Sequence, residues 1–110
     1  MNKYESIIIL KPSIDEKMKK EKIKEYKKFL KELTNTKVEV EDLGKRKLAY
    51  EIKGNTEGVY AIFKFGGNPN HISDLEKRYR TDEDIIKFVS IKQDELYEED
   101  EDSEEDEQEM

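Results

Sequence analysis

The sequence predicts an α+β fold in which two helices cover one face of a four-stranded antiparallel sheet. Four segments show the alternation or the β-branched residues that are typical of strands. Two other segments repeat apolar residues at steps of three and four, which is the period of an amphipathic helix. These segments follow one another in the order β-α-β-β-α-β. A chain of 110 residues has room for one such domain.

The first strand and the first helix are predicted from residues 3–35. Residues 3–10 are rich in β-branched side chains, and Lys11-Pro12 ends the strand. Ser13-Ile14-Asp15-Glu16 has the capping-box pattern, so we expect a helix to begin there. Asn35 is expected to end this helix in a left-handed conformation. Five apolar residues between these ends have helical spacing: Ile23, Tyr26, Phe29, Leu30 and Leu33.

A long second strand is predicted over residues 36–53, with an interruption at Leu43 and Gly44. The apolar residues on either side of this point keep the same alternation: Val38 and Val40, then Leu48, Tyr50 and Ile52. Because Leu43 breaks that alternation, we expect a bulge or bend near Gly44. The set after the bend is expected to anchor the strand. Residues 54–58 predict a hairpin turn, and residues 59–65 a third strand.

The second helix is predicted to open at Asn68-Pro69-Asn70, because proline suits the first helical turn. Ile72, Leu75 and Tyr79 give it a narrow apolar stripe. Residues 81–84 predict a turn and residues 85–92 a final strand. Two helices and four strands of these lengths suit the ferredoxin-like βαββαβ arrangement, with both helices on one face of the sheet.

Charge divides the chain into two parts. Residues 1–93 contain all 21 Lys and Arg residues and 16 acidic ones, a net charge of +5. Residues 94–110 contain 12 acidic residues and no cation. Such a segment buries too little apolar surface to fold. We therefore expect one RNA- or protein-binding domain over residues 1–93 and a disordered acidic tail over residues 94–110.

Several classes of protein are excluded by what the sequence lacks. The absence of cysteine excludes disulfides and thiol chemistry, and no apolar run is long enough for a membrane span. His71 is the only histidine, and no phosphate-binding glycine loop or nucleophile elbow is present. We expect a soluble cytoplasmic protein that is not an enzyme and that uses no cofactor, metal, membrane or small-molecule substrate.

The sheet face without helices is predicted to carry an apolar patch. Alternation in the first, third and last strands places six apolar residues there, which we take as candidate partner-binding residues: Ile7, Ile9, Tyr60, Ile62, Val89 and Ile91. A contiguous apolar patch across three strands indicates an interaction surface. The alternatives are that the alternation is wrongly assigned or that the tail folds back over the sheet.

A cationic cluster, Lys45-Arg46-Lys47, follows Gly44 and runs directly into the strand pattern. On a bent, rigid strand it is a candidate site for phosphate, and Arg46 suits phosphate best because its guanidinium has a fixed geometry. The alternative is an ordinary solvated strand end. Four further cations are candidate RNA contacts: Lys3, Lys64, Arg80 and Lys87. For Arg80, the helix dipole is an equally good explanation.

The chain resembles the family of the bacterial small-subunit ribosomal protein numbered six. The resemblance covers residues 1–93. It depends most on Leu43-Gly44, Arg46 and Leu48-Ala49-Tyr50. Four further features support it: Tyr4-Glu5, Gly58, the aromatic third strand and Asp74-Leu75. Two regions depart from the family. Asn2-Lys3 stands where the family often has arginine, and Asp82-Glu83-Asp84 stands where arginines are common.

The resemblance implies a structural role in the small ribosomal subunit. Members of this family bind the central domain of the small-subunit ribosomal RNA on the platform, as a heterodimer with ribosomal protein eighteen, through the open sheet face. Two other classes stay open for this chain. One is a ferredoxin-like dimerisation or regulatory module without RNA binding. The other is a phosphatase-like enzyme, for which no catalytic constellation is visible.

Overall fold

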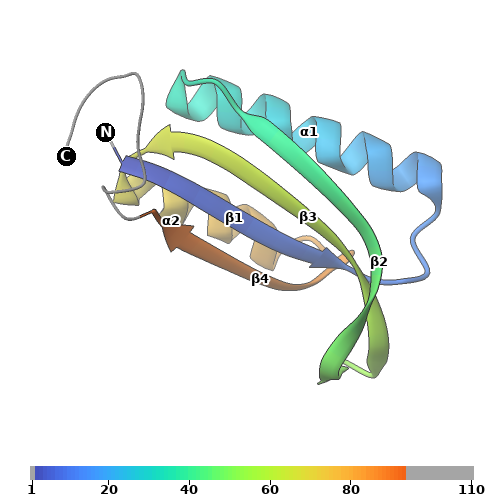
Figure 1. The fold of residues 1–110 in the computed structure, drawn as a ribbon. Coiled ribbons are helices and arrows are strands. Elements are labelled where there is room, and N and C mark those ends of the chain that lie inside the picture. Colours follow the sequence, from blue (N-terminus) through green and yellow to red (C-terminus); the bar gives the residue numbers. More distant parts are fainter. Residues whose placement is uncertain (1, 94–110) are drawn as a thin grey trace.

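The structure of the protein is a computed structural model that describes residues 2–93. The elements along the chain are β1 (Asn2–Leu10), α1 (Glu16–Thr34), β2 (Glu39–Ile52), β3 (Asn55–Gly67), α2 (Pro69–Arg80) and β4 (Ile85–Lys92). The strands pair antiparallel in the order β2-β3-β1-β4, and both helices lie on one side of the sheet (Figure 1). The predicted ferredoxin-like fold is confirmed. The expected acidic tail lies outside the described residues.

Helix α1 begins and ends through local hydrogen bonds. Asp15 is the N-cap, and its Oδ1 accepts a hydrogen bond from the backbone N–H of Met18 at 2.7 Å. The expected capping box was therefore wrong in its cap residue, because Asp15 takes the place expected for Ser13. At the other end Asn35 has φ 55, the left-handed conformation predicted for it. Tyr26 and Leu30 are buried on the sheet side of the helix.

The core lies between the sheet and the two helices. Its fully buried apolar residues come from β1, β3 and both helices: Ile8, Leu10, Leu30, Ala61, Phe63 and Leu75. Three hydroxyl groups linked by hydrogen bonds lie in this core. The Ser6 hydroxyl lies 2.8 Å from the Tyr79 hydroxyl and 3.1 Å from the Ser90 hydroxyl, so a buried serine is satisfied by two partners. Burial also raises the pKa of Tyr79, so its hydroxyl stays neutral.

An ion-pair cluster joins α1 to the turn between α2 and β4. The Nζ of Lys22 lies 2.9 Å from both Asp82 Oδ1 and Asp84 Oδ2, and Lys11 Nζ lies 2.9 Å from Asp84 Oδ1. The Tyr26 hydroxyl donates a hydrogen bond to Asp82 at 2.8 Å. Hydrogen bonds from Lys11 and Lys22 lower the pKa of Asp84. The acidic turn that departs from the family pattern thus has a structural use in this chain.

The β2–β3 hairpin extends past the end of the other strands (Figure 1). Its turn is shorter than expected. Ile52 pairs with Asn55, and Lys53 and Gly54 between them have φ 49 and φ 80, the geometry of a two-residue type I′ turn. The prediction of a turn over residues 54–58 was wrong in length, because Asn55 and Glu57 of β3 are already paired with β2, although the register shifts a second time between Lys47 and Ile52.

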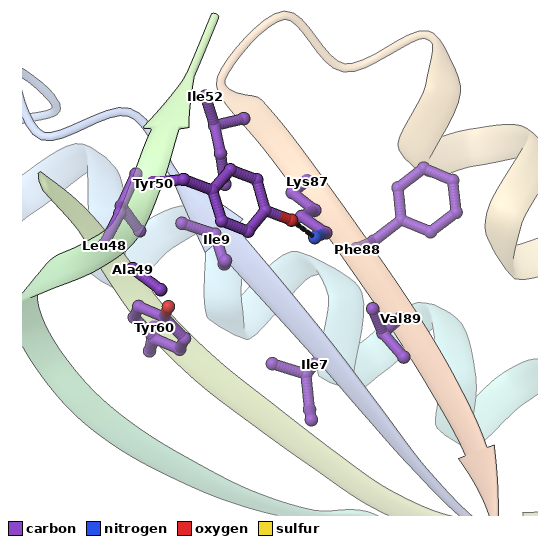
Figure 2. A pocket seen from close by; sticks show the side chains of 10 residues that line it. All are labelled: Ile7, Ile9, Leu48, Ala49, Tyr50, Ile52, Tyr60, Lys87, Phe88 and Val89. Atoms are coloured by element: carbon purple, nitrogen blue, oxygen red, sulfur yellow. Dashed lines mark hydrogen bonds between the residues drawn. The ribbon is translucent and has the colours of Figure 1, made fainter. Parts of the chain in front are cut away.

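The predicted interruption of β2 is a bulge at Leu43. Asp42 pairs with Ala61 and Gly44 with Tyr60, which leaves Leu43 without a partner in the register. One extra residue inverts the alternation of the residues paired directly behind it, Gly44 to Lys47. Val40, before the bulge, packs on the helix side of the sheet. Further along β2, where the register shifts again between Lys47 and Ile52, three apolar residues line the opposite side: Leu48, Tyr50 and Ile52 (Figure 2). Tyr50 is 60% exposed, so the expectation that it anchors the strand was wrong.

Candidate functional site

The face of the sheet opposite the helices, called the open face below, carries the apolar patch expected from the alternation. Ile7 on β1 pairs with Ile62 on β3 and with Val89 on β4, and directly paired residues share a face. Ile9 pairs with Tyr60 in the same way. Ile91 pairs with Glu5 at the far end of β4. Val89 and Ile91 are 42% and 44% exposed, so the patch is open to a partner.

The hairpin turns part of this patch into a pocket of about 230 Å³. Side chains from β1, β3 and β4 form its floor, and the outer part of β2 forms a further wall (Figure 2). Ten residues line it: Ile7, Ile9, Leu48, Ala49, Tyr50, Ile52, Tyr60, Lys87, Phe88 and Val89. Apolar side chains dominate this list, which is typical of a surface that receives an apolar group of a partner.

Gly58 allows the wall and the floor to meet. A Cβ at this position would lie 2.3 Å from Cγ2 of Ile9 and 3.4 Å from Cδ2 of Leu48. Only a residue without a side chain leaves room for Ile9, which is 7% exposed despite its place on the open face. Gly58 is thus part of the construction of the pocket.

Lys45, Arg46 and Lys47 lie side by side in β2 but on different faces. Lys45 pairs with Val59 and Lys47 with Glu57, whereas Arg46 pairs with Gly58, whose missing side chain would point onto the open face. All three are exposed. The Nε of Arg46 donates a hydrogen bond to the carbonyl of Leu43 at 3.3 Å, which ties the guanidinium to the bulge. Arg46 is therefore the cation of this cluster that borders the open face.

The other candidate cations are spread over the molecule. Lys3 lies at the end of β1 that is remote from the hairpin. Lys64 forms an ion pair with Glu41 at 3.5 Å. Arg80 lies on α2, 3.8 Å from Glu76 and with its guanidinium carbon 5.7 Å from the centre of the Phe88 ring. Of these candidates only Lys87 joins the pocket.

Sequence reasoning missed Leu48, Tyr50 and Ile52 as residues of the open face. Part of the signal was present, because the bulge predicted near Gly44 inverts the alternation of the residues directly behind it. The second register shift, between Lys47 and Ile52, was not predicted. Within residues 2–93 no group of three or more acidic or histidine side chains could hold a metal ion. Neither described helix is long and apolar enough to cross a membrane.

The fold and the open face together define a class of protein. It is a small ferredoxin-like domain that presents an apolar sheet face bordered by cations. The chain belongs to the ribosomal protein S6 family, whose family model matches residues 3–92. This confirms the family expected from the sequence, a family of structural ribosomal proteins and not of enzymes.

Individual relatives agree with this assignment. The chain is 34% identical over 92 residues to the small ribosomal subunit protein bS6 of Synechocystis sp., covering 84% of this chain and 81% of that protein. It is 40% identical over 92 residues to the protein of the same name from Helicobacter pylori, of which it spans 65%. The solved structure of 30S ribosomal protein S6 from Thermotoga maritima matches with a TM-score of 0.78 and 32% identity. That match covers 84% of this chain and 87% of the other.

Proposed function

We propose that this chain is a structural, ribosome-associated protein of the bacterial small subunit in the cytoplasm. It binds the central domain of the small-subunit ribosomal RNA together with ribosomal protein eighteen and stabilises the platform during assembly. The observation that carries the proposal is the apolar open face, with its pocket, next to the cations of the hairpin. Family membership supports the ribosomal role.

The open face supports the protein partner. Val89 and Ile91 are more than two-fifths exposed, and the residues of four strands that line the pocket beside Val89 are mainly apolar. Burying apolar surface contributes about 25 cal/mol per Å², so a partner that covers this face gains binding energy that RNA phosphates cannot supply. We therefore assign the patch of Ile7, Ile9, Tyr60, Ile62, Val89 and Ile91 to the partner protein.

The hairpin supports the RNA contact. Arg46 is held at the bulge by its bond to the Leu43 carbonyl, and Lys45 and Lys47 are exposed on the other side of the same strand. Phosphate contacts of this kind are strongly dependent on salt. Five acidic residues also lie within residues 39–57, so the affinity of the isolated protein for RNA is expected to be modest. Lys3, Lys64, Lys87 and Arg80 are assigned secondary contacts.

The assignment of the open face is tested by placing a charge on it. Val89→Glu should weaken the complex with ribosomal protein eighteen by about 10-fold to 100-fold, because an unpaired carboxylate would be buried in the interface. The control is Met18→Glu, which adds the same charge at a residue of α1 that is 46% exposed. Binding is measured by calorimetry. Equal affinities for the two variants would reject the open face as the partner site.

A ferredoxin-like dimerisation or regulatory module is the competing function. It predicts that the chain associates with itself through the same face and that small subunits do not carry it. Sedimentation of the chain with small subunits, measured at two salt concentrations, separates the two functions. Cosedimentation that Val89→Glu abolishes and Met18→Glu leaves unchanged supports the ribosomal function.

A further inference from the structure

The bulge in β2 is held by side chains on the helix side of the sheet. Oδ1 of Asp42 accepts a hydrogen bond from the backbone N–H of Gly44 at 3.0 Å. Oδ2 of the same carboxylate lies 2.9 Å from Nζ of Lys19 on α1. Lys19 also contacts Glu16 at 3.2 Å, and its side chain is only 10% exposed. One carboxylate therefore connects a helix to the backbone of the bulge.

Lys19 is an unusual residue to find so well covered. Lysine is rarely buried without a partner, because its ammonium loses hydration. The hydrogen bond to Asp42 raises the pKa of Lys19, although burial on its own would lower it. The ammonium thus stays charged, because its contacts with the carboxylates of Asp42 and Glu16 outweigh the hydration that it loses on burial.

The bulge in turn decides which way the hairpin faces. Gly44 has φ 75, a conformation that favours glycine, and Leu43 is left outside the ladder. Arg46 Nε binds the Leu43 carbonyl at 3.3 Å. If the bulge closed into a regular ladder, the residues paired directly behind it, Gly44 to Lys47, would exchange faces, and the outer hairpin that continues from them would turn with them. The pocket would then lose its outer wall, and Arg46 would leave the border of the open face.

We infer that the clamp formed by Lys19, Asp42 and the Gly44 amide positions the hairpin as the outer wall of the open-face pocket. Lys19 and Asp42 are positioning residues, since they lie on the opposite side of the sheet from the surface that they organise. The consequence for partner binding rests on the proposed function. The consequence for the hairpin does not, because it concerns the free protein.

The test compares four variants of the full chain in the absence of RNA and partner. Asp42→Ala removes both contacts, Asp42→Asn keeps an acceptor oxygen for Gly44, and Lys19→Met keeps the bulk of the lysine stem. Glu39→Ala is the control, because Glu39 is an exposed acid of the same strand whose ion pair with Lys37 does not involve the bulge. The readouts are hydrogen exchange of the Gly44 amide and nuclear Overhauser contacts between Tyr50 and Lys87. Contacts between Tyr26 and Phe63 report on the core.

Asp42→Ala is expected to speed exchange of the Gly44 amide by about tenfold, the size of effect that loss of a charged hydrogen-bond partner produces. It should also remove the Tyr50–Lys87 contacts while the Tyr26–Phe63 contacts persist. Asp42→Asn and Lys19→Met should lie between Asp42→Ala and the control. The inference is overturned if Asp42→Ala behaves as Glu39→Ala does. If Asp42→Ala does not fold, Asp42→Asn and Lys19→Met decide: Gly44 exchange no faster than in Glu39→Ala overturns the inference.

A last measurement links the clamp to binding. Lys19→Met should weaken the complex with ribosomal protein eighteen although residue 19 lies away from the open face. A variant that loses the Tyr50–Lys87 contacts yet binds normally would overturn the link. If no variant of the chain, nor the native chain, binds this partner, the proposed function fails and the clamp is still judged by its exchange and contact data.

Discussion

The ammonium of Lys87 on β4 donates a hydrogen bond to the hydroxyl of Tyr50 on β2, across the mouth of the open-face pocket (Figure 2). Nζ lies 5.0 Å from the centre of the Tyr50 ring. Because the same nitrogen binds the hydroxyl, it lies at the polar end of the ring and not over its face, so this contact is a hydrogen bond and not a cation–π interaction. Two residues from opposite edges of the sheet thus enclose an apolar pocket with a polar rim.

This contact lies at the surface and should contribute little to stability. Tyr50→Phe removes the acceptor and is expected to change the free energy of unfolding by less than about 0.5 kcal/mol. Tyr79→Phe makes the same chemical change in the core, where it removes the hydroxyl that binds Ser6. It should cost about 1–2 kcal/mol. Urea denaturation of the two variants measures both free energies. Equal losses would show that the buried hydrogen bond between Tyr79 and Ser6 does not stabilise the fold as described.

Gly58 is expected to be intolerant of any side chain. In Gly58→Ala the new Cβ would clash with Ile9, so the floor of the pocket must shift, at a cost of about 1–3 kcal/mol. Partner binding should fall as well, because Ile9 and Leu48 both line the pocket. Thr56→Ala, an exposed change in the same strand, is the control. A Gly58→Ala protein as stable as the control would show that the hairpin and the floor do not pack as described.

The ion-pair cluster predicts how stability depends on acid. The pKa of Asp84 is lowered in the folded chain from its ordinary value of 3.8, chiefly by the hydrogen bond from Lys11 and then by that from Lys22. The ionised carboxylate therefore stabilises the fold above pH 3.8, and this contribution is lost as the pH falls through the lower pKa of the folded state. Asp84→Asn should remove about 1 kcal/mol at pH 7 and flatten the acid limb of the stability curve.

The control for this prediction is Glu83→Gln, the exposed neighbour of Asp84. Thermal unfolding is followed from pH 2 to pH 7 for both variants. If Asp84→Asn retains the native dependence on pH below 3.8, the cluster does not stabilise the fold in the way described.

Stability at alkaline pH depends on the same cluster, and there it falls as the pH rises. Burial on its own would lower the pKa of Lys22, but the hydrogen bonds to Asp82 and Asp84 together outweigh it, so this pKa is raised. Burial, and then the hydrogen bond to Asp82, raises the pKa of Tyr26. Both groups favour folding in their protonated forms, so their contribution is complete below pH 10 and declines above it. Lys22→Met should therefore lower stability at pH 7 and reduce the further loss between pH 10 and pH 12. A loss of the same size as in the native chain would contradict this.

The sequence was sufficient for the fold and for most of the open face, because both depend on periodicity. Alternation in β1, β3 and β4 placed Ile7, Tyr60 and Val89 on one side of the sheet. The same alternation was insufficient to place the residues of the β2–β3 hairpin. The unpaired Leu43 inverts the faces of the residues directly behind it, and a second register shift follows between Lys47 and Ile52. Beside the bulge, Asp42 contacts a helix more than 20 positions earlier, which the spacing of apolar residues does not reveal.

The cations illustrate a second limit. Composition marks Lys45, Arg46 and Lys47 as one cluster, yet the strand separates them onto two faces and Arg46 alone borders the open face. Arg80 and Lys3 lie apart from this group, on α2 and at the far end of β1. Charge along a sequence does not reveal on which face of a strand each cation lies.

The most direct test of the account reverses the charge of Lys45, Arg46 and Lys47 together and measures binding to the central domain of the small-subunit ribosomal RNA with ribosomal protein eighteen present. The matched control reverses Lys24, Lys27 and Lys28, three exposed lysines of α1. We expect the hairpin variant to bind at least about tenfold more weakly and to reduce the slope of log affinity against log salt by about 1–3, while the control binds as the native chain does. Equal affinity and an unchanged slope in the hairpin variant would contradict the proposal that this hairpin holds RNA.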